Sequence, residues 1–433
     1  MPAPRPIALV NARLVDPASG YDGPGSVLAA SGVISDVLQK PAIEGLSPEI
    51  ETVDCGGAML APGLVDIRVK TGEPGAETKE TLKSAARAAA VGGVTSIVVQ
   101  PDTEPAVDEP SVVDFILRRA RDIGLSKVYP AGAATKGLAG QEMAEIGLMR
   151  EAGCLYVTDV DRPITNSQVM RRAMTYAHGF GVPFAHRPAD PSLSELTAAH
   201  ESEFAARMGL VAGPAIGERI MLERDLALAE LTGATLIVDQ LSTGDALESL
   251  ERAKAKGLNV RATVSINHLS FNEIDIGDYR TFYKLSPPLR GEDDRQALVE
   301  ALAGGLIDVV VSAHAPAPAE DKRLPFDEAT PGAVGLETLL PALLGLHHER
   351  RAPLIDLMAA VTLKPARLLG LDAGALAKGA PADLVVCDIG APVKVDADRL
   401  ISKSKNSPFD GRSLQGKVML TLVDGRIVHD ARV

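Results

Sequence analysis

The sequence predicts an α/β protein: a (β/α)8 TIM barrel with a small β-sandwich domain formed by both ends of the chain. Two observations lead to this prediction. Between residues 62 and 370, apolar strand-like runs alternate with segments of helical period, and repeated strand–helix units indicate a parallel sheet with helical crossovers. Both flanks are instead typical of short strands separated by turns. The predicted parts are residues 1–61 and 371–433, which share the sandwich, and the barrel at 62–370.

The N-terminal flank begins with an apolar strand over residues 7–15, and the turn residues of 16–20 follow it. Two further strands are expected over 26–30 and 33–38. Short strands with tight connections favour a small antiparallel sheet over a further strand–helix unit.

The central region supplies the barrel units. Its strands are expected at 64–69, 96–99, 155–158, 236–238 and 307–311. Its helices are expected at 78–91, 112–123, 167–180, 246–256 and 336–348. This many strand–helix units favour a closed barrel over an open sheet.

The C-terminal flank returns to strands at 382–387, 417–422 and 426–429. The dipeptide Asp424-Gly425 lies between the last two, and this pair is typical of a two-residue hairpin turn. Strands at both ends of the chain can therefore pair into one domain.

Composition limits the classes of function. The chain has 433 residues, 3% aromatic residues and no Trp, so its core must be aliphatic and offers little for stacking on bases. The formal net charge of −13 repels phosphate backbones, so we expect no nucleic-acid partner.

The cysteines and the apolar runs bear on the compartment. Cys55, Cys154 and Cys387 are far apart and form no CxxC pair, so we expect no disulfides and a cytoplasmic protein. Residues 1–17 lack a signal-peptide pattern, and no uninterrupted apolar run reaches about 18 residues, so no membrane association is expected.

In a barrel of this kind, functional residues lie after the carboxyl ends of the strands. The segments at these positions are VDIRVKTGEPG (65–75), VQPDT (99–103), VTDVDRP (157–163), FAHRPAD (184–190), IVDQLST (237–243) and VSAHAPA (311–317). Together with framework segments such as SPPLRGEDD (286–294) and GAPADLVVCD (379–388), they resemble dihydroorotases and related cyclic amidohydrolases. The resemblance covers nearly the whole chain, from about Ala8 to Val428.

The resemblance implies a zinc site, and this sequence departs from it at most ligand positions. The family's His-x-His, whose alternate residues share one strand face, is replaced by Arg68 and Lys70. Both are protonated donors without a free lone pair. Gln240 replaces a ligand His, and Ala313 replaces the Asp that is both ligand and general base. The ligand positions that match the family are Asp159 and His186.

The positions that hold substrate in the family also differ. Gly72 replaces the Arg that binds the substrate carboxylate, and Asp102 replaces an Asn. Ser286 replaces another Asn, whereas Arg290 is retained. His314 is retained as well, but its neighbours in the motif are not. We therefore expect these five residues to form a vestigial pocket.

These replacements predict no catalytic residues, no metal site and no cofactor, so we do not expect an enzyme. Within the family, inactive homologues hold aspartate carbamoyltransferase in an active assembly. The resemblance thus implies that this chain is a structural partner of that transferase in pyrimidine biosynthesis. We also expect the chain to form homo-oligomers.

A physical hypothesis accompanies this prediction. Without zinc, Asp159 would be an unpaired buried carboxylate, which is unfavourable. We expect Arg68 and Lys70 to form ion pairs with Asp159, and with Asp102, and so to fill the pocket. The alternative is that both cations point to solvent at the barrel mouth.

Two further functions remain open. The chain could be a zinc-dependent dihydroorotase or related cyclic amidohydrolase whose metal is bound by Asp159, His186 and a third ligand, His268 or His314. It could also be a small-molecule binding module in which Arg68 and Lys70 bind phosphate.

Overall fold

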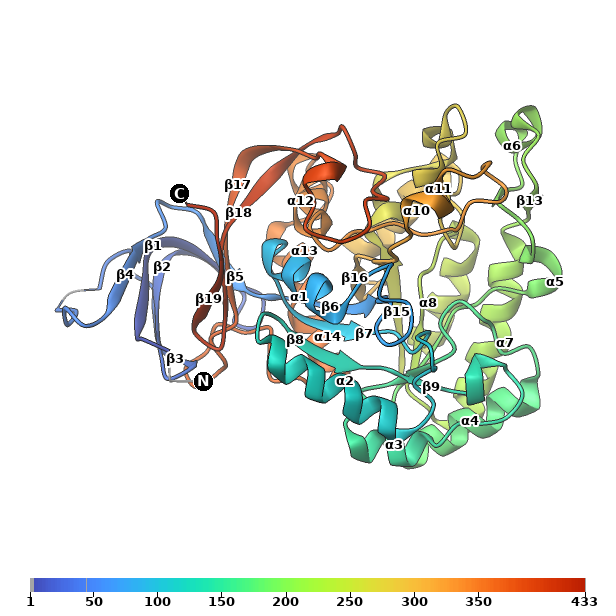
Figure 1. Cartoon of the computed structure of the whole chain (residues 1–433), viewed down its shortest axis with the longest axis horizontal. Helices are drawn as coiled ribbons and strands as arrows, with labels where there is room; N and C mark the ends of the chain where they lie inside the picture. The colour runs from blue at the N-terminus through green and yellow to red at the C-terminus, as the bar shows by residue number, and fades with distance from the viewer. Residues whose placement is uncertain (1–3, 44, 433) are drawn as a thin grey trace.

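Strands from both ends of the chain share one sheet, which lies beside an α/β barrel in the computed structural model (Figure 1). The structure describes residues 4–43 and 45–432. The sheet has the order β19-β18-β17-β5-β1-β2-β3, with β4 paired to β1. Its strands are β1 (Ile7–Asp16), β2 (Tyr21–Ala30), β3 (Val33–Leu38), β4 (Glu51–Asp54), β5 (Met59–Pro62), β17 (Leu384–Lys394), β18 (Ser413–Val423) and β19 (Arg426–Asp430).

The two ends of the chain meet where β5 pairs antiparallel with β17, with Pro62 opposite Leu384. Leu9, Leu60 and Leu420 belong to one buried apolar cluster between the strands, so both ends contribute to a common core. The predicted sandwich from both termini is thus present in the fold.

The barrel strands run parallel, and an isolated bridge from Val69 to His314 joins the first strand to the segment after the last. They are β6 (Leu64–Val69), β7 (Val94–Val99), β8 (Lys127–Pro130) continued by β9 (Gly132–Ala133), β10 (Val157–Thr158), β11 (Phe184–His186), β14 (Leu236–Val238), β15 (Val260–Ser265) and β16 (Val309–Val311). This confirms the predicted (β/α)8 barrel.

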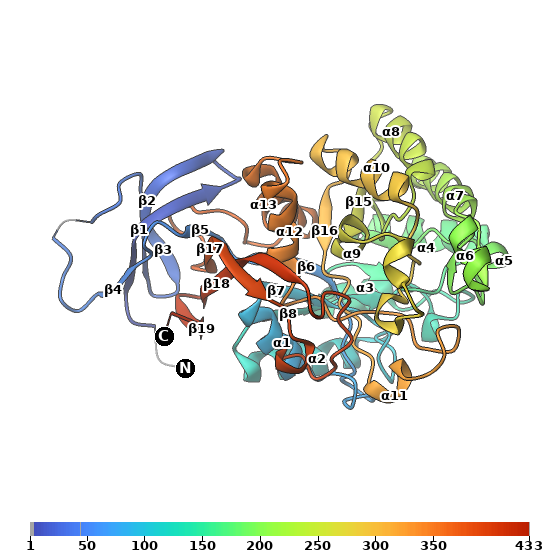
Figure 2. The same cartoon turned by 90° about the horizontal axis from the view of Figure 1, so that it is seen from above.

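Helices cover the outside of the barrel (Figure 2). They are α1 (Leu82–Val91), α2 (Pro110–Ile123), α3 (Ile146–Ala152), α4 (Ser167–Gly179), α7 (Ile216–Thr232), α8 (Leu247–Ala255), α10 (Glu292–Ala303), α12 (Leu339–His348), α13 (Leu354–Val361) and α14 (Leu363–Leu369). An excursion between β11 and α7 contains α5 (Pro191–Ser194), β12 (Ala199–His200), α6 (Glu203–Met208) and β13 (Ala212–Gly213). Shorter elements are α9 (Ile266–Ser270), α11 (Ala319–Lys322) and the 3-10 turns η1 (Lys136–Leu138), η2 (Gly244–Ala246), η3 (Glu273–Ile276), η4 (Thr281–Tyr283) and η5 (Ala397–Arg399).

Aliphatic side chains fill the barrel. Ile67, Val98, Ile237, Val309 and Val311 form a buried cluster among the strands. Branched aliphatic residues are the usual filling of such barrels, so the near absence of aromatic residues is no obstacle to a dense core.

Several expected elements have the predicted bounds, and others differ for local reasons. The strands at 33–38, 64–69 and 236–238 are confirmed. The helix expected from residue 78 begins at Leu82, because the Thr81 hydroxyl accepts a hydrogen bond from the Ser84 amide at 3.0 Å and caps it.

The strand expected at 382–387 is longer, because the β17–β18 hairpin continues past the sandwich. There β18 packs on α12, and a Cβ at Gly416, whose φ is 119°, would lie 2.5 Å from Leu344 Cδ1. Within the described ranges, no helix is both long and apolar enough to cross a membrane.

Candidate functional site

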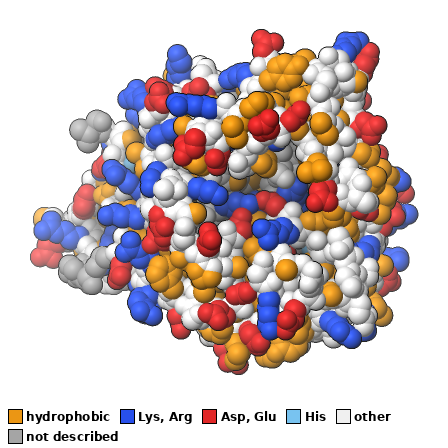
Figure 3. Space-filling model, turned by 45° about the vertical axis from the view of Figure 1, so that its right-hand side comes forward, with side chains coloured by type: hydrophobic (Ala, Val, Ile, Leu, Met, Phe, Trp, Pro, Cys, Tyr) orange, Lys and Arg blue, Asp and Glu red, His pale blue; other side chains and the backbone are white. Residues whose placement is uncertain are grey.

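The candidate site lies at the carboxyl ends of the barrel strands. Figure 3 shows a hollow on this face, in which Lys and Arg side chains lie among Asp and Glu. Arg68, Lys70, Asp161 and Gln240 line a cavity there, together with Ala313. Its free volume is about 30 Å³, which is room for about two water-sized groups.

Arg68 lies in β6 and points into the barrel, where it is 3% exposed. Its Nε donates to Asp239 Oδ2 at 2.7 Å, and its Nη2 donates to Asp161 Oδ1 at 2.8 Å. With its amide oriented to satisfy both groups, the Gln240 side-chain oxygen accepts from Arg68 Nη2 at 2.9 Å. Burial alone would lower the pKa of Arg68, but the charges of Asp239 and Asp161 raise it.

Asp161 is the centre of this arrangement. Its Oδ2 accepts from Lys70 Nζ at 2.5 Å, and its Oδ1 accepts from Arg187 Nη1 at 2.6 Å as well as from Arg68. Lys70 Nζ also lies 2.7 Å from Asp102 Oδ2. Burial acts to raise the pKa of Asp161, but Lys70, Arg68 and Arg187 hold it well below its usual range.

We call Arg68, Lys70, Arg187, Asp102, Asp161 and Asp239 the ion cluster. The predicted pair of Lys70 with Asp102 is confirmed. The predicted pairing with Asp159 is wrong, and so is the alternative that both cations point to solvent, because Arg68 is buried.

Asp159 has other partners. It accepts from the Ala134 amide at 3.0 Å, from the Thr135 amide at 2.9 Å and from the Thr135 hydroxyl. Burial raises its pKa despite these donors. The chain then turns at Val160, with φ of 56°, and it is Asp161 that reaches the cations.

His186, the other matching ligand position, is held at both nitrogens. Its Nδ1 lies 2.6 Å from Asp225 Oδ2, and its Nε2 accepts from the Ile164 amide at 2.9 Å. An accepting Nε2 places the ring proton on Nδ1. A metal could take Nε2 only by displacing the Ile164 amide.

The two proposed third ligands are also remote or engaged. His268 Nε2 lies 3.2 Å from the Pro288 carbonyl oxygen, and burial lowers its pKa to about 4. His314 is fully buried, with Nδ1 accepting from the Gly335 amide and Nε2 3.6 Å from Glu80. Over residues 4–43 and 45–432, no three His, Cys, Asp or Glu side chains are grouped to hold a metal ion. The donors present do not fit zinc.

The predicted vestigial pocket is only partly assembled. Ser286 lines the same small cavity as the ion cluster, and Asp102 joins that cluster through Lys70. Arg290 lies in a neighbouring pocket, where its Nε donates to the Ser242 hydroxyl at 3.0 Å. His314 is buried beneath the mouth.

Gly72 is excluded from the pocket by its own loop. Its amide donates to the Glu80 carbonyl oxygen at 2.8 Å, and its carbonyl oxygen accepts from the Ala76 amide at 2.5 Å. A Cβ at this position would lie 1.8 Å from the Ala76 carbonyl oxygen. The loop is thus folded too tightly for the Arg that the family places here.

Asp161, Arg187 and Asp239 were not predicted from the sequence as partners in the ion cluster. A signal was present, because each follows a barrel strand within a segment already singled out. Two cations placed at a buried strand end require carboxylates nearby, and these segments supply them.

Comparison with known proteins gives the class. A dihydro-orotase-like family model matches residues 57–246, and an amidohydrolase family model matches residues 338–429. A protein named dihydroorotase from Anaeromyxobacter dehalogenans strain 2CP-1 is 41% identical over 420 residues, which are 96% of each chain. Another dihydroorotase, from Desulforapulum autotrophicum, is 39% identical over 99% of this chain and 100% of its own. The chain therefore belongs to the dihydroorotase family of amidohydrolases.

Solved structures agree on the fold. The L-hydantoinase (dihydropyrimidinase) from Arthrobacter aurescens has a TM-score of 0.87 at 26% identity, over 98% of this chain and 96% of that one. A dihydropyrimidinase from Brevibacillus agri has a TM-score of 0.85 at 20% identity, over 98% and 95%.

The first prediction concerns Asp161. We expect Asp161→Asn to lower the free energy of unfolding by about 2–3 kcal/mol, toward the low end for a broken buried ion pair because part of the side chain reaches solvent. In this variant, three cations share one negative charge fewer. Urea unfolding monitored by circular dichroism measures the change in the free energy of unfolding. The exposed Asp122→Asn is the matched control and should change little.

The sign of the pH dependence follows from the lowered pKa of Asp161. Its contribution is fully present above the unfolded pKa of about 3.9 and is lost as the pH falls through the lower folded value. The difference between wild type and Asp161→Asn should therefore be constant near neutral pH and shrink in acid. A difference that grows in acid would contradict this role.

The second prediction concerns Gly72. Gly72→Arg restores the family residue, but we expect it to destabilise the fold by about 1–3 kcal/mol, because the Cβ meets backbone. Gly72→Ala should cost a similar amount, since the conflict arises at Cβ. Gly179→Ala, where nothing lies within 4 Å, is the control. Stable Gly72 variants would show that the loop can open.

Proposed function

We propose that this protein is a catalytically inactive member of the dihydroorotase family. In this proposal it acts in the cytoplasm as a structural partner of aspartate carbamoyltransferase in pyrimidine biosynthesis. The observation that supports it is the ion cluster, in which Arg68 and Lys70 occupy the family's His-x-His positions and are neutralised by Asp161, Asp239 and Asp102.

The chemistry of a cyclic amide explains why this arrangement argues against turnover. Hydrolysis or closure of the ring needs an activated water and a base that accepts its proton. Ala313, at the family's position for that base, has a methyl side chain that cannot accept a proton. Asp161, the carboxylate that lines the cavity beside Ala313, is engaged with cations, and the cavity admits about two water-sized groups.

The transferase is proposed as the partner because of the family resemblance. The surface of the chain carries exposed apolar side chains that could make the contacts. Leu148 on α3, Phe180 after α4 and Leu231 on α7 are large apolar side chains that are 51%, 44% and 68% exposed. The helices α3, α4 and α7 lie next to one another. Exposed apolar side chains on neighbouring helices can contact a protein partner or a second copy of this chain.

A second candidate function is zinc-dependent dihydroorotase activity. It is favoured by the relatives, since proteins 41% and 39% identical over nearly the whole chain carry that name. Activity would require a ligand set other than the one the family motif specifies, because Arg68, Lys70, Gln240 and Ala313 stand at ligand positions.

One experiment separates the two. The purified chain is incubated with zinc, and its metal content and turnover of dihydroorotate are measured beside the Anaeromyxobacter dehalogenans relative, which serves as the positive control. We expect the relative to turn over dihydroorotate. We expect this chain to hold no stoichiometric zinc and to show no turnover of dihydroorotate.

The assembly is tested in the same preparation. Aspartate carbamoyltransferase from the same organism is mixed with the chain, and size-exclusion chromatography with light scattering gives the stoichiometry of any complex. We expect a complex of fixed stoichiometry that raises transferase activity. Stoichiometric zinc with turnover, or two proteins that elute separately, would overturn the proposal.

A further inference from the structure

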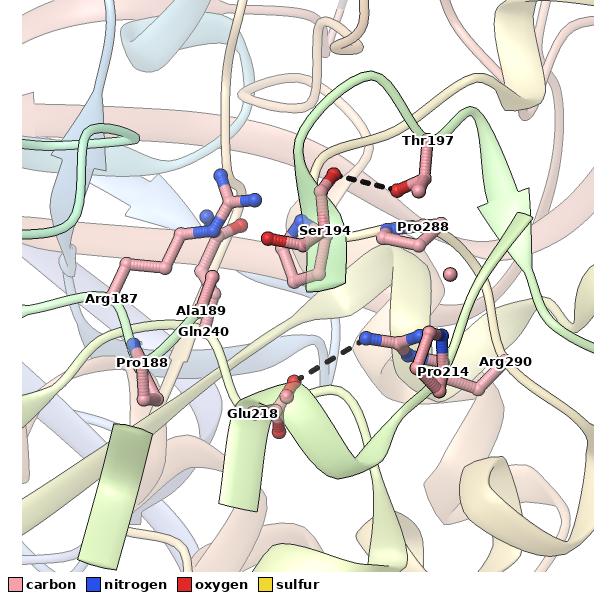
Figure 4. Close-up of a pocket in the computed structure, with 13 residues that line it drawn as sticks. Arg187, Pro188, Ala189, Ser194, Thr197, Pro214, Glu218, Gln240, Pro288 and Arg290 are labelled. Atoms are coloured by element: carbon pink, nitrogen blue, oxygen red, sulfur yellow. Dashed lines mark hydrogen bonds and ion pairs between the residues drawn. The ribbon is translucent and has the colours of Figure 1, made fainter. Parts of the chain in front are cut away.

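A second pocket lies beside the ion cluster and is lined by Arg187, Arg290, Ser194 and the start of α7 (Figure 4). In this view the two arginines lie on opposite sides, with Ser194 between them. Pro188, Pro214, Pro287 and Pro288 supply stiff apolar walls. The free volume is about 30 Å³, so the pocket admits a group of two or three heavy atoms rather than a whole metabolite.

Arg187 brings unused donors to this pocket. It is 8% exposed, and its Nη1 is bound to Asp161 at 2.6 Å. Its Nε is buried, and no partner for it exists among the described residues. A buried guanidinium nitrogen without an acceptor is unfavourable, so an acceptor that reaches it would be stabilised.

Arg290 is also incompletely neutralised. Its Nη2 lies 3.8 Å from Glu218 Oε2, and its Nη1 lies 3.5 Å from His200 Nδ1. Glu218 is turned toward Ser242 and Thr243, and its Oε1 accepts hydrogen bonds from their amides at 2.9 and 3.2 Å. Burial lowers the pKa of Arg290, and Glu218 does not fully compensate. The two terminal nitrogens thus lack a close acceptor.

The third element is the N-terminus of α7. This helix has 17 residues, and no side chain caps its first turn at Ala215. Pro214 and Gly217 of this turn line the pocket. The Gly217 and Glu218 amides already donate to the Pro214 and Ala215 carbonyl oxygens, at 3.5 and 3.0 Å, so it is the positive end of the helix dipole that favours an anion at this place.

We propose that this pocket binds the carboxylate group of a small organic acid, held by Arg187 and Arg290 across the start of α7. A carboxylate has three heavy atoms and accepts paired hydrogen bonds from a guanidinium, which fits both the free volume and the donors. A phosphate group has five heavy atoms and a tetrahedral shape, so it serves as the comparison ligand. The site goes beyond the proposed function, since binding requires neither turnover nor a partner.

This pocket also replaces an earlier expectation. Arg68 and Lys70, the phosphate ligands of the binding-module alternative, are paired with carboxylates of the chain. The donors with spare capacity lie one strand end away, on Arg187 and Arg290.

The test uses the full-length chain with succinate and acetate as probes and with inorganic phosphate for comparison. Binding is followed by thermal shift and by line broadening of ¹³C-labelled acetate, at constant ionic strength set with sodium chloride. We expect saturable binding of the carboxylates, at least tenfold weaker in Arg187→Gln and in Arg290→Gln. Arg290→Lys, which keeps the charge but loses the planar fork, should weaken binding less than Arg290→Gln.

The matched control is Arg219→Gln, which also removes one positive charge but does so on α7, at a residue that does not line the pocket. It should bind like the wild type. Because Arg187→Gln also loses the ion pair to Asp161, each variant is judged by its ligand-dependent shift and not by its stability alone. No saturable binding beyond the effect of chloride, binding of phosphate only, or equal binding by all variants would overturn the inference.

Discussion

Neutralisation of Arg68 inside the barrel is the constraint on which the rest of the site depends. A guanidinium at 3% exposure is tolerated only when carboxylates surround it, and Asp161 and Asp239 do so at 2.8 and 2.7 Å. Asp161, which pairs with Arg68, also pairs with Lys70 and Arg187. Lys70 in turn pairs with Asp102. The mouth of the barrel is thereby filled with matched charges, and little space for a ligand remains.

The fold could be predicted well because its signals are local. The strands at 33–38, 64–69 and 236–238 are short apolar runs bounded by turn residues, and such runs have few alternative structures. The excursion that contains α5, α6 and two very short strands was not predicted, since its residues 191–213 carry no strong period. Long-range packing, not local pattern, determines its path.

The sequence could predict which of the family's ligand positions are replaced, but not which ion pairs the replacing residues form. The replacement of His by Arg68 and Lys70 is visible in the sequence, as is the absence of the base at Ala313. Which carboxylate meets the cations is not visible, because Asp159 and Asp161 are two residues apart and the choice depends on the positive φ at Val160. Gly72 shows the same limit, since its tight loop is a property of Ala76 and Glu80 as well.

The ion cluster also restricts which substitutions the protein can accept one at a time. A single change of Arg68 back to His would leave Asp161 and Asp239 short of a partner before any metal could bind, so the first step toward a zinc site passes through a destabilised intermediate. Return at Gly72 is opposed separately by backbone. Mutational paths toward a zinc site must therefore cross several barriers, whereas paths that change the outer surface of the helices cross none of them.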